Sequence, residues 1–497
     1  MVIRHRSLRL SFGLCFITGL SFFAGVFYWI HVIGGFKLID FFPLLAYFGL
    51  YYGLFGLAFN FISKKTAFPS VIAAPVLWVS LEYFRANAGF LSLPCALLGH
   101  SQYLHLPIIQ ISDITGVYGV SFLIVMVNAA VSEILYVLCS RFFGVSGDDG
   151  TTGKQNPHLA ISVPATVIVL GISLVYGFSL LDKGSEGERL SISVIQPNIP
   201  QGIKWKREFR KQNLDRHVRL TKEAAINQDV SLIIWPESAV RGPIGQNSFL
   251  SKSIFSLAKE TKAHLLIGSS QRPKFGPQEF RLRSRSNNAI LISPKGRMEG
   301  QYQKIRLLPF GEYLPYRDTL PWPSRLISKI GNYIPGNEYT IFEVNGVRFG
   351  ALICWESLFP GLVRQFVKRG ADLMVNITNE AWFGETAVPY QFMAITVFRA
   401  VENRVPLARA ANTGISCFID PFGRVTGRVV DNNKDIFVEG YLTQEIPVSH
   451  GMTFYTRYGD VLAFVCIAFS LSLVLWSALR AIRGVSNLET RSTEGNS

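Results

Sequence analysis

Long apolar stretches dominate both ends of the chain and predict a part that is embedded in a membrane. Six of them approach or reach the roughly 20 residues that a helix needs to cross a bilayer. They lie at residues 10–30, 41–62, 68–84, 117–138, 159–181 and 461–479. The third is the weakest, because it is short and carries Glu82 near its end. We expect a membrane α-helical bundle, with about five spans within residues 1–181 and one more within 459–497.

Residues 182–458 have a different pattern, which predicts a folded α/β domain. Short apolar, β-branched runs predict strands, and longer runs with a spacing of three and four residues predict helices. The expected strands lie at 190–196, 232–235, 265–269, 289–293, 347–354 and 373–377, and the clearest helices at 208–225 and 362–369. Strands that alternate with helices are typical of a layered α/β domain. Two long loops, at 272–287 and 311–337, are candidates for lids or binding surfaces.

The basic residues suggest an orientation in the membrane. The net charge is +15, and cytoplasmic segments of membrane proteins are enriched in Lys and Arg. Four segments outside the apolar stretches are basic, through Arg4, Arg6, Arg9, Lys64, Lys65, Arg141, Lys154, Arg480 and Arg483. If all four are cytoplasmic, both termini lie inside and the α/β domain faces the periplasm of a bacterial inner membrane. No basic repeat or nucleic-acid motif accompanies the charge, so no nucleic-acid partner is expected.

The first stretch follows three arginines and could be mistaken for a secretion signal. Its apolar run is too long for the hydrophobic region of a typical signal peptide, and no clear small-x-small cleavage site follows it. We therefore expect residues 10–30 to remain in the protein as its first membrane helix.

The cysteines supply the first candidate for chemistry. None of the six belongs to a CxxC pair or a metal-ligand cluster, so we expect neither a disulfide framework nor a metal site. Cys354 ends the apolar run 349–353, and polar residues follow it. A nucleophile at a strand terminus is held rigidly with one face open to substrate. The alternative is a cysteine packed in the core, which is a common fate for this residue.

A reactive thiol also needs a base, because the thiolate is the nucleophile. No histidine stands in a convincing motif. Glu237 follows the apolar run 232–235 and Pro236, where it could accept the thiol proton. Lys304 precedes the segment 305–312 and could place a positive charge beside a developing oxyanion. Taken singly, each of these residues is equally compatible with an ordinary surface position.

Taken together, Glu237, Lys304 and Cys354 form an ordered set with gaps of 67 and 50 residues, each beside an expected strand. This arrangement resembles the carbon–nitrogen hydrolase (nitrilase) superfamily, whose members use a Glu-Lys-Cys triad on an αββα sandwich. The resemblance implies a nitrilase-like αββα sandwich for residues 182–458 and covalent catalysis through the cysteine.

The chain as a whole resembles the apolipoprotein N-acyltransferase family. The resemblance covers nearly all of the sequence and ends with a helix that returns the chain to the membrane. Its motifs are Trp-Pro-Glu-Ser at 235–238, Pro-Phe-Gly-Glu at 309–312, Asn-Glu-Ala-Trp-Phe-Gly at 379–384 and Arg-Ala-x-Glu-Asn-Arg at 399–404. Three features depart from the family. Trp355 stands where Tyr is usual, Glu380 stands where Asp is usual, and about six spans replace about eight.

The resemblance implies transfer of an acyl chain from a phospholipid, the sn-1 chain of phosphatidylethanolamine, to Cys354 as a thioester. The acceptor is then the α-amino group of the N-terminal diacylglyceryl-cysteine of a lipoprotein. Glu312 and Glu356 are supporting residues, and Glu356 is expected to orient Lys304. No metal or organic cofactor is implied. Candidates for lining the acyl or headgroup path are Trp205, Trp355 and Trp382.

Two other functions are compatible with parts of the pattern. A membrane-tethered amidase or nitrilase acting on a small amide is favoured by Trp355, because Cys-Trp-Glu is common in soluble nitrilases. A transporter with a non-catalytic outer domain is the alternative outside enzymes. Few ionisable residues lie within the expected spans, and this argues against a path for ions or solutes.

Overall fold

The computed structural model describes residues 7–33, 38–66, 68–143, 159–182, 187–226, 228–245, 248–272, 284–322, 327, 330–448 and 451–494. The chain divides into two compact units: Met1–Leu180 with Asp460–Ser497, and Leu181–Gly459. Most of the expected loop at 272–287 lies outside the described residues, as does part of the loop at 311–337. The basic residues Arg4, Arg6, Lys37 and Lys154 also lie outside them.

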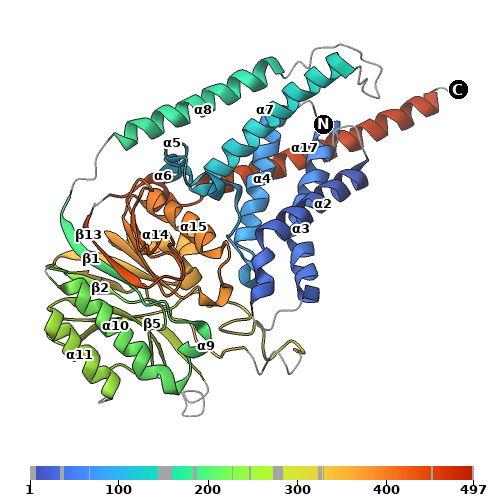
Figure 1. Cartoon of the computed structure of the whole chain (residues 1–497). Coiled ribbons are helices and arrows are strands. Elements are labelled where there is room, and N and C mark those ends of the chain that lie inside the picture. Colours follow the sequence, from blue (N-terminus) through green and yellow to red (C-terminus); the bar gives the residue numbers. More distant parts are fainter. Residues whose placement is uncertain are drawn as a thin grey trace. The chain divides into compact units, whose positions relative to one another are not determined.

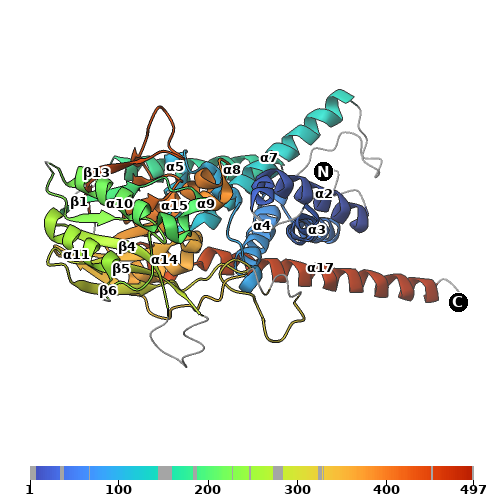
Figure 2. The ribbon, with the colours of Figure 1, turned by 60° about the horizontal axis from the view of Figure 1, so that its bottom comes forward.

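The first unit is helical. Its long helices are α2 (Leu8–Val26), α3 (Leu38–Lys65), α4 (Ser70–Ala86), α7 (Val117–Phe143), α8 (Leu159–Leu181) and α17 (Val461–Glu494). Short helical turns at η1 (Tyr28–Val32), η2 (Gly89–Leu91), η3 (Leu98–Gln102), α5 (Leu106–Ile109) and α6 (Ser112–Thr115) connect some of them. Figures 1 and 2 show α2 and α3 side by side. A Cβ atom at Gly56 of α3 would lie 2.6 Å from the Ser11 carbonyl of α2, so glycine permits this close packing.

Five helices among the described residues are long and apolar enough to cross a bilayer. These spans are Leu8–Val26, Ile39–Lys65, Val117–Ser140, Leu159–Leu181 and Val461–Arg483. The expected sixth stretch, at 68–84, is helical in α4. It has only 17 residues and includes Glu82 and Arg85. Length and composition therefore give one span fewer than expected, and α4 is the helix that makes the difference.

Helix α4 is nevertheless the best-packed helix of this unit. It contacts α3, α7 and α17, and most of its side chains are buried. Its two charged groups find partners nearby: Glu82 accepts from the Leu98 N–H at 2.8 Å, and Arg85 donates to the Cys95 carbonyl at 2.9 Å. The charged side chains of α4 therefore bind backbone groups within the helical unit.

The second unit contains two β-sheets. The first has the strand order β13-β1-β2-β4-β5-β6, with β3 paired to β4, and the second has the order β12-β11-β10-β9-β8-β7. The first sheet consists of β1 (Arg189–Gln196), β2 (Leu232–Ile234), β3 (Val240–Arg241), β4 (His264–Gln271), β5 (Ser286–Ile292), β6 (Met298–Gln303) and β13 (Gly440–Pro447). The second consists of β7 (Ile341–Val344), β8 (Val347–Ile353), β9 (Leu373–Thr378), β10 (Leu407–Ala411), β11 (Cys417–Ile419) and β12 (Val425–Arg428).

Helices cover the outer faces of the two sheets, as Figure 1 shows. Helices α10 (Arg210–Ala225) and α11 (Phe249–Thr261) pack on the first sheet, and α14 (Pro360–Lys368) and α15 (Val388–Asn403) belong to the second. The sheets meet through β1 with β10 and β5 with β8. The unit is therefore a four-layered αββα sandwich.

Side-chain alternation explains why the central strands are buried on both faces. In β2, Ile233 joins a hydrophobic cluster with residues of α10 and α11, while its neighbours Leu232 and Ile234 point to the opposite face. Every expected strand is present. The additional strands are β3, β6, β7, β10, β11, β12 and β13. β3, β7, β11 and β12 have two to four residues, β10 has five and contains an arginine, and β6 and β13 carry many polar residues.

The parallel pairing brings the ends of several strands to one edge. β1, β2 and β4 are parallel in the first sheet, and β8, β9 and β10 are parallel in the second. Glu237 lies just beyond β2, Cys354 just beyond β8, and Asn379 just beyond β9. Ligand sites of α/β sheets form at the carboxyl ends of parallel strands, and the three residues occupy that position.

Candidate active site

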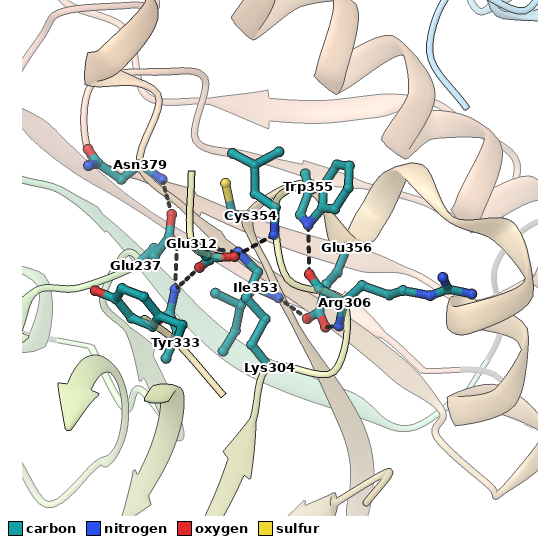
Figure 3. Close-up of polar contacts among 12 residues, drawn as sticks. Glu237, Lys304, Arg306, Glu312, Tyr333, Ile353, Cys354, Trp355, Glu356 and Asn379 are labelled. Atoms are coloured by element: carbon teal, nitrogen blue, oxygen red, sulfur yellow. Dashed lines mark hydrogen bonds and ion pairs between the residues drawn. The ribbon is translucent and has the colours of Figure 1, made fainter. Parts of the chain in front are cut away.

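Two acidic side chains and one lysine form a buried ionic cluster at this edge. Glu237 is 8% exposed and Lys304, which follows β6, is 1% exposed. The Lys304 Nζ lies 2.9 Å from Glu312 Oε1 and 3.8 Å from Glu237 Oε1 (Figure 3). A lysine that is removed from water in this way is compatible with folding only when carboxylates compensate its charge.

The surrounding carboxylates keep Lys304 charged. Burial by itself lowers the pKa of Lys304, but the negative charges of Glu312, Glu237 and Glu356 help to raise that pKa above the ordinary value for lysine. The side chain is therefore an ammonium at neutral pH. An ammonium has three donors, and among the described residues it donates to Glu312 Oε1, whereas the 3.8 Å separation from Glu237 is too long for a hydrogen bond. N–H groups therefore remain for a further acceptor.

Glu237 is held by neutral donors as well. Its Oε1 accepts from Asn287 Nδ2 at 2.7 Å, and its Oε2 accepts from the Asn379 backbone N–H at 3.0 Å. Asn287 Nδ2 also donates to Glu312 Oε1 at 3.2 Å. Glu312 Oε2 in turn accepts from the Leu308 N–H at 2.7 Å, which fixes the acid on its own loop. These bonds set the orientation of both carboxylates relative to Lys304.

Cys354 begins the short helix η5 (Cys354–Leu358) directly after β8. Its φ is +59°, a left-handed conformation that costs a residue other than glycine of the order of 1 kcal/mol or more. Its carbonyl accepts from Asn376 Nδ2 at 3.2 Å and from Ser357 Oγ at 3.4 Å. Strained residues of this kind persist where the surrounding structure holds them, and here the sharp turn places the thiol at the strand end.

The thiol is protonated at rest. Burial raises the pKa of Cys354, and the Glu237 and Glu312 carboxylates raise it further, whereas Lys304 opposes them. In Figure 3 the sulfur of Cys354 lies on the same side of the group as the Glu237 carboxylate. Formation of the thiolate therefore requires transfer of the proton to a nearby base.

Glu356 has a different position from the one expected. Its Oε1 accepts from the Ile305 N–H at 2.8 Å, the Arg306 N–H at 2.9 Å and the Tyr302 hydroxyl at 2.9 Å, and its Oε2 accepts from the Ile353 N–H at 2.8 Å. These bonds hold the backbone on either side of the site, whereas Glu312 makes the direct contact with the ammonium. Burial raises the pKa of Glu356 to about 7, against the opposing effect of Lys304.

The three candidate tryptophans differ in exposure. Trp355 is 5% exposed, packs edge-to-face on Phe359 and donates from Nε1 to the Arg306 carbonyl at 2.6 Å. It thus fills the protein interior at the position where the family usually has Tyr. Trp382 is 49% exposed on the turn η6 (Ala381–Phe383), and Trp205 is half-buried at the end of α9 (Gln201–Lys204).

A second buried ionic group, which the sequence did not predict, lies behind the site. Arg409 of β10 pairs with Glu380 and hydrogen-bonds to Asn376 Oδ1, and Arg409 and Glu380 are both fully buried. Asn376 donates to the Cys354 carbonyl, and Glu380 follows the Asn379 whose N–H binds Glu237. This ionic group therefore connects the backbone of Cys354 with the segment whose Asn379 N–H binds Glu237.

The presence of Glu380 in place of Asp has a structural explanation. A Cβ atom at Gly414 would lie 1.6 Å from Glu380 Oε2, so only glycine leaves room for the longer acid. An arginine in the middle of the short apolar strand β10 was the available signal for this group, since an unpaired charge is not tolerated in such a place.

Comparisons with known proteins agree with the division of the chain into a membrane part and an α/β domain. The carbon-nitrogen hydrolase family model matches residues 191–449, and the model of the apolipoprotein N-acyltransferase N-terminal domain matches residues 1–130. A solved amidase from Nesterenkonia sp. is 22% identical, with a TM-score of 0.38, over 53% of this chain and 93% of that chain. Fold and site thus define a carbon–nitrogen hydrolase domain carried by a chain with membrane helices.

Curated relatives specify the family more closely. The apolipoprotein N-acyltransferase of Geobacter metallireducens is 40% identical over 400 residues, which are 80% of this chain and 72% of that protein. The protein of that name from Chlorobaculum tepidum is 30% identical over 442 residues, 85% of this chain and 80% of that protein. The chain belongs to the apolipoprotein N-acyltransferase family. It is a multi-pass bacterial membrane protein and an acyltransferase.

Proposed function

We propose that the enzyme transfers an acyl chain from a phospholipid to the α-amino group of the N-terminal diacylglyceryl-cysteine of a lipoprotein, through a thioester on Cys354. The phospholipid is phosphatidylethanolamine and the chain is the one at sn-1. The observation that supports these roles most strongly is the buried ammonium of Lys304 between Glu237 and Glu312, beside a protonated cysteine.

In the first step, Glu237 accepts the proton of Cys354 and the thiolate attacks the ester carbonyl. Lys304, through an N–H that does not bind Glu312, stabilises the negative charge that develops on the carbonyl oxygen. The carbon–oxygen bond to glycerol breaks, Glu237 returns the proton to the leaving alkoxide, and a lysophospholipid departs. Covalent catalysis divides one difficult acyl transfer into two easier ones.

In the second step, the α-amino group attacks the thioester carbonyl and Glu237 accepts a proton from that amine. Lys304 again faces the oxyanion. The carbon–sulfur bond breaks, an amide forms and the thiol of Cys354 is restored. Because Asn287 and Asn379 fix both oxygens of Glu237, the same carboxylate serves as base in both steps without reorientation.

Both substrates carry acyl chains that are costly to remove from a bilayer, so the domain must work at a membrane surface. We propose that this is the periplasmic face of the inner membrane, with both chain termini in the cytoplasm. This orientation needs an even number of crossings, and α4 must then cross as the sixth span. Its contacts with α3, α7 and α17 support this, and its 17 residues extend about 25 Å, near the thickness of the hydrocarbon core.

A reporter that is active only in the periplasm tests the orientation. Inserted near Gly187 it should be active, and fused after Ser497 it should be silent. Silence near Gly187 together with activity after Ser497 would place the α/β domain in the cytoplasm, which is the result expected if α4 does not cross. Because α17 is the long helix between the two positions, equal results at both would show that α17 does not cross.

The reaction itself is tested with the purified full chain, phosphatidylethanolamine labelled in its sn-1 chain, and a synthetic diacylglyceryl-cysteine peptide. The label should appear as an amide on the peptide N-terminus. Release of the label only as free fatty acid would instead indicate a hydrolase. Cleavage of small amides without any acylation of the peptide would support the amidase alternative.

A further inference from the structure

A pocket with basic walls lies beside Glu237 in the α/β unit. It is open to solvent, and the space between its walls, solvent included, is about 410 Å³. Its walls come from the end of α9 and the residues after it, from α10, and from the segment that follows Glu237. We call this feature the basic pocket, and the residues that give it its charge and shape are Lys204, Trp205, Lys206, Arg210, Ser238 and Arg241.

Of the four cations in the basic pocket, Lys206 lies 4.0 Å from the Glu208 carboxylate, at the surface. Among the residues that the structure describes, no carboxylate lies within ion-pair distance of Lys204, Arg210 or Arg241. Burial lowers the pKa of Arg241, and the neighbouring cations Arg285, Arg210 and Arg207 lower it further. Several positive charges are thus held close together, which favours the binding of an anion.

Arg241 is already fixed in position. Its Nη1 donates to the Trp205 carbonyl at 3.1 Å, and its guanidinium lies 5.7 Å from the centre of the Trp205 ring. The remaining N–H groups form a planar fork that matches the geometry of a phosphate. A side chain that is held before binding loses less conformational entropy when a ligand arrives.

Lys204 links the basic pocket to the proposed base. It is 9% exposed, and its Nζ donates to the Glu237 carbonyl oxygen at 3.1 Å. Burial lowers the pKa of Lys204 to about 8, opposed by Glu237, so most molecules carry the charge at neutral pH. Ser238, the next residue after Glu237, lines the basic pocket. An anion in the pocket therefore lies next to the acid that would activate Cys354.

We propose that the basic pocket binds the phosphodiester of the phospholipid that donates the acyl chain. This inference rests on the proposed function and names the group by which the donor is recognised. Arg241 and Arg210 contact the phosphate oxygens, and Lys204 adds charge at the end nearest Glu237. Binding at this point holds the glycerol ester, a few bonds from the phosphate, beside the catalytic cluster.

The charge also separates the two proposed substrates. The donor carries a negative phosphate, whereas the diacylglyceryl-cysteine acceptor has no phosphate and ends in an amine. Clustered cations attract the former and disfavour the protonated form of the latter. The basic pocket therefore acts in the first half-reaction and is not required once the thioester has formed.

The experiment measures acylation of Cys354 in the full chain from vesicles that contain phosphatidylethanolamine or, at the same mole fraction, diacylglycerol without phosphate. The variants are Arg241→Gln and Arg210→Gln. Arg219→Gln is the matched control, because Arg219 lies on α10, loses the same charge and is paired with Glu223 and Glu439 outside the pocket. p-Nitrophenyl butyrate, a small ester without phosphate, reports whether each variant retains a competent nucleophile.

For the wild-type enzyme and Arg219→Gln, acylation from phosphatidylethanolamine should be faster than from diacylglycerol. Each pocket variant should lose about tenfold or more in kcat/KM for phosphatidylethanolamine, the effect of removing a hydrogen bond to a charged group. Reaction with p-nitrophenyl butyrate should stay within about twofold. Equal use of both lipids by wild type, or unchanged use of phosphatidylethanolamine by both pocket variants, would overturn the basic pocket as the phosphate site.

Two soluble competitors identify the source of the phosphate. Glycerophosphoethanolamine should inhibit acylation of the wild-type enzyme, and this inhibition should weaken in Arg241→Gln. Inhibition by inorganic phosphate but not by glycerophosphoethanolamine would indicate a site for free phosphate and overturn the proposal. If wild type forms no acyl-enzyme from either lipid but reacts with p-nitrophenyl butyrate, the proposed function itself fails, which is a distinct outcome.

Discussion

The two sheets of the α/β unit contribute different chemistry to the same edge. The first sheet supplies the acid and the ammonium, Glu237 and Lys304, which are compensated by direct contact with each other and with Glu312. The second supplies Cys354, a neutral thiol whose backbone is fixed by Asn376, and that asparagine is held by Arg409. In the proposed mechanism, the first sheet carries the charges needed for the reaction and the second positions the nucleophile.

This difference indicates how the site remains both reactive and stable. Glu356 joins the halves, because its carboxylate accepts N–H groups from Ile305 and Arg306 near the first sheet and from Ile353 in the second. The nucleophile and its base are therefore supported by separate scaffolds with a small number of bonds between them. Substitutions in each half should have separable effects on chemistry and on stability.

The largest effect is expected at the nucleophile. Cys354→Ala should abolish acylation of the enzyme and transfer to the peptide, because alanine has no thiol at the position of the proposed nucleophile. Cys417→Ala is the matched control. Cys417 is a buried residue of β11 in the same sheet, and its loss should leave most activity. An acyl-enzyme in the Cys354 variant, measured with labelled phospholipid, would contradict the role given to this half of the site.

The next largest effects are expected in the charged half. Glu237→Gln should prevent single-turnover acylation, because an amide cannot accept the thiol proton. Lys304→Ala should reduce the rate by about 10²–10³-fold through the loss of an oxyanion donor. Normal single-turnover rates in either variant would remove that residue from the catalytic group.

A smaller effect on activity and a larger one on stability are expected behind the nucleophile. Arg409→Met leaves Glu380 buried without its cation, which should cost about 3–5 kcal/mol. Arg348→Met removes the partly exposed pair with Asp372 and should cost about 1 kcal/mol or less. Thermal unfolding in detergent compares the two variants. Equal unfolding midpoints would show that the Arg409–Glu380 pair does not support the second half.

The smallest expected change concerns the link between the halves. Glu356→Gln replaces an acceptor oxygen by an NH₂ group that cannot accept an N–H, which should cost about 1–3 kcal/mol and slow acylation without abolishing it. Glu343→Gln, at an exposed position of β7, should change neither property. If Glu356→Gln matched that control in unfolding midpoint and rate, the two halves would not depend on this carboxylate.

The sequence predicted the parts of the fold that depend on local pattern. Apolar runs such as 232–235 and 347–354 became strands, and residues at their ends reached one edge because neighbouring parallel strands end together. The order Glu237, Lys304, Cys354 was sufficient to suggest the site. The short edge strands were missed because two to four residues give too little periodicity, and α4 was ambiguous because its polar residues are compensated only in the folded bundle.

Contacts between distant segments could not be predicted in the same way. Nothing local indicates that Glu312, rather than Glu356, contacts Lys304, because the contact depends on the geometry of the loop that carries Glu312. The partner of Arg409 lies 29 residues away in sequence, and that of Asn287 lies 50 residues away. Such bonds depend on the packing of strands that are remote in the chain.

The most direct test of the account is intact-mass and peptide analysis of the full chain after incubation with phospholipid in the absence of acceptor. The wild-type enzyme should gain the mass of one acyl chain on the peptide that contains Cys354, and hydroxylamine should remove it. The Glu237→Gln variant should remain unmodified. An adduct on another residue, or an equally acylated Glu237→Gln variant, would contradict the claim that Glu237 activates Cys354 for acyl transfer.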